Sequence, residues 1–150
     1  MYKPIFHTSK ESIPQGAEIT DAFERSLKEL FFVRNPRFKK GEPLTDAALA
    51  EFITREASAT DGVFVYYPWL HKAVRIPEEK IYFELRTARN KNIISRDEQE
   101  KYNDRTVGIA GMSVGSAIAL ALAMTGGANR MRLADFDEIE VTNLNRLRAG

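Results

Sequence analysis

The stretch VGIAGMSVGSAIAL, residues 107–120, places two glycines where an apolar run gives way to a run of small residues. A glycine at such a turn lets the backbone approach an anion, and the N–H groups at the start of the next helix point at that anion, helped by the helix dipole. Gly111 and Gly115 are therefore candidates for binding phosphate, together with Ser113 and the hydroxyl of Ser116. The alternative is a glycine turn that only allows a helix to pack closely against a strand.

Two carboxylates follow the next apolar segment, in the sequence LADFDEIE. Ligands of open α/β sheets bind outside the carboxyl ends of the strands, and Asp135 falls at such an end. Its spacing from the glycine turn is close to the roughly 20 residues found in dinucleotide sites, where an acidic residue accepts hydrogen bonds from ribose hydroxyls. Asp137 could help to hold a metal ion or to order the loop. The plain alternative for Asp135 is a solvated carboxylate at a strand end.

The residues after this acidic stretch distinguish between classes of nucleotide-binding protein. A glycine turn and a ribose carboxylate also suit an NAD(P)-dependent oxidoreductase, but hydride transfer has no use for the cluster of Asn143, Asn145 and Arg146. The run of Gly-Ser, then Asp-x-Asp, then Thr-Asn-Leu-Asn-Arg resembles the ThiF/MoeB family, the ubiquitin-activating-type adenylating enzymes. The resemblance covers residues 105–148.

The resemblance implies a site for ATP, accompanied by Mg²⁺. In that site the turn at residues 111–116 would hold the phosphates, and Asp135 would bind the ribose. Asn143, with Asn145 beside it, would contact the nucleotide. The substrate implied is the C-terminal carboxylate of a ubiquitin-like protein, a sulfur-carrier protein or a peptide, and the protein would act as a homodimer.

The resemblance also implies a catalytic role for Arg146, as an arginine finger that reaches the phosphates, in family dimers from the neighbouring subunit. The substrate carboxylate would attack the α-phosphate and give an acyl-adenylate and pyrophosphate. A guanidinium is suited to this step because it can bridge two phosphate oxygens of a transition state that gains negative charge. The alternative for Arg146 is a surface salt bridge.

The chain departs from the usual G-x-G-G-x-G-S turn of the family. Without gaps, three positions expected to hold glycine are occupied by Ala110, Met112 and Ser113. If Gly111 is aligned as the first glycine, the loop is one residue shorter instead. The family also carries an arginine on a helix upstream of the first strand. Arg89, in the sequence LRTARN, is a candidate for this nucleotide-binding role; the alternative is an exposed helix arginine.

The pattern of apolar residues places these candidates on a strand–helix–strand unit. We expect a short buried strand at residues 107–110, a helix at 116–125 that ends at Gly126 and Gly127, and a second strand at 130–135. The right-handed crossover makes the two strands parallel. The helix is apolar nearly all round, which predicts that its outer face is also covered. Because two strands make a poor parallel sheet, we expect a fragment of a longer enzyme that is inactive in ATP–pyrophosphate exchange by itself.

Residues 1–104 predict a mostly helical region that precedes the nucleotide-binding segment at 105–150. Three helices are expected after Thr20, Thr45 and Pro77, with apolar faces formed by Phe23, Leu27, Leu30 and Phe31, by Leu49, Phe52 and Ile53, and by Ile81, Leu85 and Ala88. A capping-box pattern at Ser95 and Glu98 predicts a fourth helix at 96–102. The exception is an extended segment at 62–70, GVFVYYPWL, whose aromatic residues fit either a core or a surface that binds a partner. The fold class expected is α/β, with a Rossmann-like βαβ start and an incomplete parallel sheet.

Composition excludes several other functions. The 150 residues include 22 Lys and Arg against 21 Asp and Glu, a net charge of +1, which gives no reason to expect a nucleic-acid or membrane partner. The chain has no cysteine and only His7 and His71, so we expect no metal site built from thiolate or imidazole ligands. Without a signal peptide or a long apolar run, a cytoplasmic location is the default. A third hypothesis, beside the adenylating enzyme and the oxidoreductase, is a non-catalytic domain that uses its aromatic residues to bind a partner.

Overall fold

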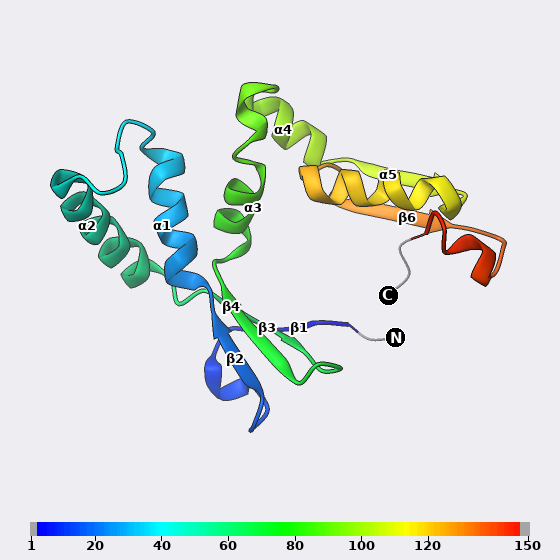
Figure 1. Cartoon of the computed structure of the whole chain (residues 1–150), viewed down its shortest axis with the longest axis horizontal. Coiled ribbons are helices and arrows are strands. Elements are labelled where there is room, and N and C mark those ends of the chain that lie inside the picture. Colours follow the sequence, from blue (N-terminus) through cyan, green and yellow to red (C-terminus); the bar gives the residue numbers. More distant parts are fainter. Residues whose placement is uncertain (1–2, 148–150) are drawn as a thin grey trace. The chain divides into compact units, whose positions relative to one another are not determined.

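The computed structural model describes residues 3–147, and the chain forms two compact units, Met1–Leu85 and Arg86–Gly150 (Figure 1). The first unit contains β1 (Ile5–His7), a 3-10 turn (Lys10–Ser12), β2 (Glu18–Asp21), α1 (Phe23–Arg34), α2 (Pro43–Ala59), β3 (Val63–Tyr67), β4 (Lys72–Ile76) and most of α3 (Glu79–Thr87). The second contains a 3-10 turn (Asn90–Asn92), α4 (Arg96–Asn103), β5 (Thr106–Ala110), α5 (Met112–Thr125), β6 (Arg130–Ala134) and a 3-10 turn (Val141–Asn143). The α/β class with parallel strands is confirmed.

The first unit is built on a four-stranded sheet in the order β1-β3-β4-β2. β3 and β4 form an antiparallel hairpin, β1 pairs antiparallel with β3, and β2 pairs parallel with β4. Phe64 and Tyr66 alternate along β3 and therefore lie on one face of the sheet, where they pack with Ala73 and Ile13. The aromatic segment predicted at 62–70 thus supplies core residues through β3, and β3 ends before Pro68.

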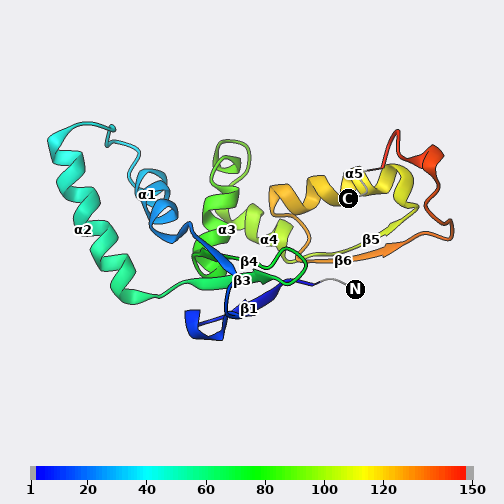
Figure 2. The same cartoon turned by 60° about the horizontal axis from the view of Figure 1, so that its bottom comes forward.

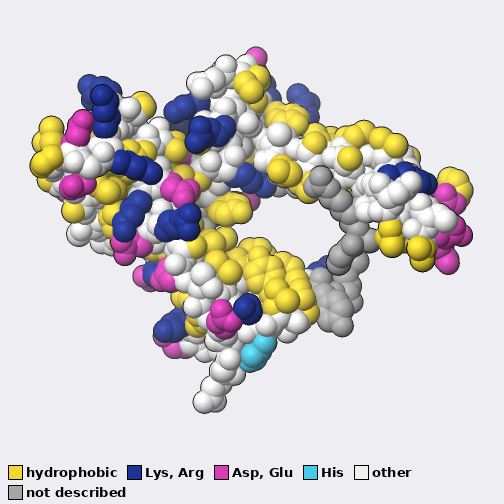
Figure 3. All heavy atoms as spheres, in the orientation of Figure 1, with side chains coloured by type: hydrophobic (Ala, Val, Ile, Leu, Met, Phe, Trp, Pro, Cys, Tyr) yellow, Lys and Arg dark blue, Asp and Glu magenta, His cyan; other side chains and the backbone are white. Residues whose placement is uncertain are grey.

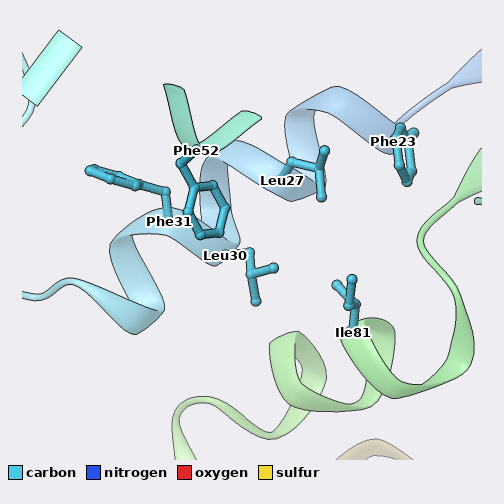
Figure 4. Packing of buried hydrophobic residues seen from close by; sticks show 6 residues of the cluster. All are labelled: Phe23, Leu27, Leu30, Phe31, Phe52 and Ile81. Carbon is cyan, nitrogen blue, oxygen red and sulfur yellow. The ribbon is translucent and has the colours of Figure 1, made fainter. Parts of the chain in front are cut away.

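The helices of this unit meet in a second apolar cluster (Figure 4). Its buried members are Phe23, Leu27, Leu30 and Phe31 of α1, Phe52 of α2 and Ile81 of α3. Leu27 and Leu30 have no exposed surface, and the ring of Phe31 packs edge-on against that of Phe52 at 5.5 Å between centroids. The helical spacing in the sequence therefore identified the packed residues of α1 and α2 correctly, and those of α3 at Ile81 and Leu85.

The expected helix starts at Thr20 and Thr45 are wrong. Thr20 lies in β2, and α1 begins at Phe23, whose N–H donates to Oδ1 of Asp21 at 2.9 Å. Thr45 lies inside α2, because Pro43 can occupy the first turn, where its missing N–H costs nothing. α3 begins at Glu79, beyond Pro77, and ends before Ala88, whose expected place on its apolar face is also wrong.

Helix exceeds strand in residues 3–104, as expected, but β1, β2 and β4 were not predicted. The physical reason is that β1 and β2 have only three and four residues and are largely exposed, and β2 pairs with a strand distant in the sequence. The second unit begins at Arg86, so α4 belongs to the same compact unit as the βαβ segment.

The start of the second unit confirms the expected capping box. Oγ of Ser95 accepts from the N–H of Glu98 at 3.2 Å, and the N–H of Ser95 donates to Oε2 of Glu98 at 2.7 Å. α4 runs from Arg96 to Asn103, close to the predicted 96–102.

The βαβ segment has the predicted parallel strands, in a register that pairs Val107 with Met131 and Ala110 with Ala134. α5 covers one face of the two strands (Figure 2) and ends at Gly126, which adopts the left-handed conformation with φ 70°. The expectation of a buried strand at 107–110 is corrected, because one face of β5 is covered and its alternate residues are exposed.

Apolar side chains remain exposed on the outer side of α5 (Figure 3). Val114, Ile118 and Met124 are 71%, 52% and 65% exposed. Within the described part of this unit no element covers that side, so the cover that the sequence predicts is not supplied by residues 86–147. None of the helices within residues 3–147 is both long enough and apolar enough to span a membrane.

Candidate functional site

The turn between β5 and α5 requires glycine at one position. Gly111 precedes the first helical residue with φ 85° and ψ 105°, a conformation that residues with a side chain rarely adopt. Its N–H donates to the carbonyl oxygen of Ala134 at 2.8 Å, which fixes the turn to the end of β6. The turn and the carboxyl end of β6 therefore lie together, as a ligand site in an open α/β sheet needs.

α5 begins at Met112, four residues before the start that the sequence predicts at 116. Ser113, Gly115 and Ser116 consequently lie in the first turns of the helix rather than in a loop before it. The amide groups of a helix's first turn have no partners within the helix, so this end of α5 presents N–H donors beside Gly111.

Gly115 is buried, and its place in the site is explained by packing. A Cβ atom on this residue would lie 2.6 Å from Cγ2 of Ile109, much closer than any normal contact. The absence of a side chain therefore lets α5 approach β5 closely, which keeps the first turn of α5 next to the strand ends. Ser116 also serves the helix, because its Oγ donates to the carbonyl oxygen of Ser113 at 3.1 Å.

Asp135 follows β6 directly and caps the start of α5. Its Oδ2 accepts from the N–H of Met112 at 2.5 Å, and its Oδ1 accepts from the N–H of Asp137 at 3.0 Å. These two hydrogen bonds, that from Asp137 first, hold the pKa of the Asp135 carboxyl below its ordinary value. The carboxylate is exposed, and each oxygen can accept a further hydrogen bond, so ribose hydroxyls can still reach it.

Arg146 reaches back to the same helix end from the segment after β6. Its Nε donates to Oγ of Ser113 at 2.5 Å. Its Nη1 donates to Oδ1 of Asn145 at 3.0 Å and to the carbonyl oxygen of Thr142 at 3.4 Å. A guanidinium therefore lies beside the first turn of α5.

The two predicted asparagines take part in the local structure of this segment. Oδ1 of Asn143 accepts from the N–H of Glu140 at 2.8 Å and closes the 3-10 turn, whereas Asn145 contacts Arg146. Asp137 is exposed, and its N–H orders the loop through Asp135. The part of the chain from 3 to 147 contains no group of three His, Cys, Asp or Glu side chains that could hold a metal ion.

The structure thus brings Gly111, Ser113, Asp135 and Arg146 to one end of α5, but it does not bring Arg89 there. Residues near Arg89 in the sequence contact the C-terminal end of α5 instead. Nη1 of Arg86 donates to the carbonyl oxygen of Ala123 at 3.1 Å. Nδ2 of Asn90 likewise donates to that of Thr125 at 2.9 Å. A helix of 14 residues is roughly 20 Å long, which separates these carbonyl groups from Gly111.

Sequence reasoning missed two features of this site. One is the N–H of Met112, which donates to Asp135. It was missed because the sequence predicts that the helix starts at 116 and not at Met112. The other is the hydrogen bond between Ser113 and Arg146, which joins residues 33 positions apart and leaves no periodic signal.

The fold and this helix end together define a Rossmann-like βαβ unit with a polar site at its strand ends. Residues 86–148 match the model of the ThiF family, which confirms the resemblance over that segment; Arg148 itself lies outside the described residues. The chain is 41% identical over 87 residues to "Uncharacterized protein MT1398" of Mycobacterium tuberculosis (strain CDC 1551 / Oshkosh). That match covers 58% of this chain and only 12% of the relative's length. No solved structure matches the chain significantly.

Proposed function

We propose that this protein is an ATP-dependent adenylyltransferase of the ThiF/MoeB type. Its substrate would be the C-terminal carboxylate of a ubiquitin-like protein, a sulfur-carrier protein or a peptide. Cytoplasmic location, a homodimer and Mg²⁺ bound with ATP are parts of this proposal. The observation that supports it is the convergence of a positive-φ glycine, a helix N-terminus, Asp135 and Arg146 at one end of α5, within the segment that matches the ThiF family.

These residues have distinct roles in the proposed reaction. Asp135 would accept hydrogen bonds from the ribose, and the first turn of α5 would face the phosphates. An oxygen of the substrate carboxylate would attack the α-phosphorus, and the bond to the β-bridging oxygen would break and release pyrophosphate. Arg146 would stabilise the negative charge that develops on the phosphate oxygens, which is where a fixed guanidinium contributes most.

The test is ATP–pyrophosphate exchange by the full-length protein, with candidate carrier proteins or peptides as substrates. We expect Arg146→Ala to lower the exchange rate by roughly 100-fold or more, the loss typical of removing one donor to a developing anion. Arg96→Ala is the matched control, because Arg96 is an exposed arginine that bonds within its own helix, at 3.1 Å to Glu100.

Thermal shift with ATP-Mg²⁺ and with NAD distinguishes this proposal from the oxidoreductase reading, because a bound ligand raises the stability of the folded state. Stabilisation by ATP-Mg²⁺ is expected. Stabilisation by NAD with none by ATP-Mg²⁺ would contradict the adenylyltransferase proposal, as would exchange that proceeds undiminished in Arg146→Ala.

A further inference from the structure

In the ungapped alignment with the glycine-rich turn of the ThiF/MoeB family, Ser113 stands at a position expected to hold glycine, and its hydroxyl has a specific partner. Oγ of Ser113 accepts from Nε of Arg146 at 2.5 Å, across 33 residues of sequence. A hydrogen bond from an ionised donor is among the stronger ones that proteins make. The serine therefore supplies a contact that glycine at the same position could not supply.

The hydrogen bonds of Arg146 use two of the three nitrogens of its guanidinium. Arginine has five N–H donors. Nε is taken by Ser113, and Nη1 by Oδ1 of Asn145 and the carbonyl oxygen of Thr142. Among the residues that the structure describes, Nη2 has no hydrogen-bond partner, so the two donors on that nitrogen remain available to an anion.

We propose that Ser113 is a positioning residue: its Oγ holds Nε of Arg146 so that Nη2 is directed toward the phosphates of the bound nucleotide. That the ligand is a nucleotide rests on the proposed function. The hydrogen bond between Ser113 and Arg146 does not depend on it. An arginine that is already held loses less rotamer freedom when it meets the phosphates, and binding is stronger for that reason. Glycine at position 113 would let the backbone approach the phosphates closely. Serine instead holds the side chain of Arg146.

The contact can be measured without nucleotide. In protein labelled with ¹⁵N-arginine, the Nε–H signal of Arg146 is identified by its loss in Arg146→Lys, and its exchange with water is followed. We expect slow exchange in the wild type, fast exchange in Ser113→Ala and restored protection in Ser113→Thr, which keeps the hydroxyl. Ser58→Ala is the control, because the hydroxyl of Ser58 donates to the carbonyl oxygen of Arg55 within α2.

The effect on nucleotide binding is tested by a double-mutant cycle with Mg-ATP. Ser113→Ala should weaken binding by roughly 3- to 10-fold, the effect of losing one hydrogen bond. Because the serine acts through Arg146, the same substitution should change the dissociation constant little in an Arg146→Ala background. Ser113→Thr should bind as the wild type does.

The outcomes separate this inference from the proposed function. If Mg-ATP binds and Ser113→Ala weakens binding equally in both backgrounds, the positioning role is overturned while the adenylyltransferase proposal stands. Identical exchange of the Arg146 Nε–H in wild type and Ser113→Ala also overturns it. If the wild type binds no Mg-ATP, both proposals fail, even where the exchange measurement shows the contact.

Discussion

At the scale of single residues, Asp135 joins two backbone segments through one carboxylate. It accepts from Met112 at the start of α5 and from Asp137 in the loop after β6. A negative charge at a helix N-terminus is favourable, because it meets both the unpaired amides and the positive end of the helix dipole. The same carboxylate is the proposed ribose acceptor, so its ionisation matters to the fold as well as to binding.

The depressed pKa of Asp135 predicts a pH-dependent contribution to stability. A carboxyl whose pKa is lower in the folded state stabilises the protein above the pKa of the unfolded state, and this contribution is lost as the pH falls through the folded value. Asp135→Asn should therefore unfold at a lower temperature than the wild type at pH 7, and the difference should shrink below about pH 4. Thermal melts from pH 7 to pH 3 check this.

The control for this measurement is Asp104→Asn, which removes an equal charge at the C-terminal end of α4. A difference between Asp135→Asn and wild type that stays constant across the whole pH range would show that the charge of Asp135 does not cap α5.

Gly115 gives a second prediction at this scale. Gly115→Ala places a methyl group 2.6 Å from Cγ2 of Ile109, so α5 and β5 must separate. Overpacking of this kind costs about 1–3 kcal/mol of unfolding free energy. Chemical denaturation measures the loss, and Ile109→Ala in the same chain should recover part of it; simple additivity of the two losses would contradict the contact.

At the scale of elements, α4 shows how a short helix is specified by its ends. Its eight residues carry little apolar surface, but the reciprocal bonds of Ser95 and Glu98 satisfy two backbone donors at its start. Within α4, Gln99 is buried, and its Nε2 donates to the carbonyl oxygen of Gly126, the residue just beyond α5, at 3.1 Å. α4 therefore supplies the carbonyl groups at the end of α5 with a partner.

Removal of the cap should destabilise α4 measurably. Ser95→Ala is expected to cost about 1 kcal/mol, the usual value for an N-cap serine. Hydrogen exchange of the amides in residues 96–103 should quicken, while Ser58→Ala, away from any helix N-terminus, should leave that region unchanged. No change in the exchange of α4 after Ser95→Ala would show that its packing alone maintains the helix.

Elements with a strong local signal could be predicted from the sequence. The apolar spacing in α1 and α2, the capping box of α4 and the glycine stop after α5 are all local, and the structure confirms them. β1 and β2 gave no such signal, because each acquires its strand conformation by pairing with β3 or β4, far along the chain. In the site, the sequence pattern predicted the position of Asp135 at the end of a strand. The hydrogen bond between Arg146 and Ser113 could not be predicted, because it depends on the path of residues 135–146 back to the start of α5.

At the scale of the whole molecule, apolar residues are distributed unequally between the two units. The first unit buries a cluster around Leu30, which has no exposed surface. The second leaves large apolar side chains exposed beyond β6, among them Phe136 at 95% and Val141 at 84%.

This distribution predicts that truncating an apolar side chain changes the free energy of unfolding much more in the first unit than in the segment after β6. Leu30→Ala should lower the free energy of unfolding by about 2–5 kcal/mol, because it leaves a cavity in the α1–α2–α3 cluster. Phe136→Ala should change it by no more than about 0.5 kcal/mol, as an exposed substitution does. Urea denaturation of both variants checks the contrast, and comparable losses would mean that Phe136 is covered in solution.

The parallel pairing of β2 with β4 also sets an order of events during synthesis. β2 leaves the ribosome long before its partner, and the whole of α1, α2 and β3 must follow before β4 can reach it. A helix forms from contacts between residues close in the sequence and can form before the rest of the chain is made. Two strands distant in the sequence can pair only after the long loop between them closes. We therefore expect nascent chains that end before residue 72 to hold helical structure with an unfinished sheet, and the N-terminal twenty residues to acquire protection from proteases only after residue 76 has emerged.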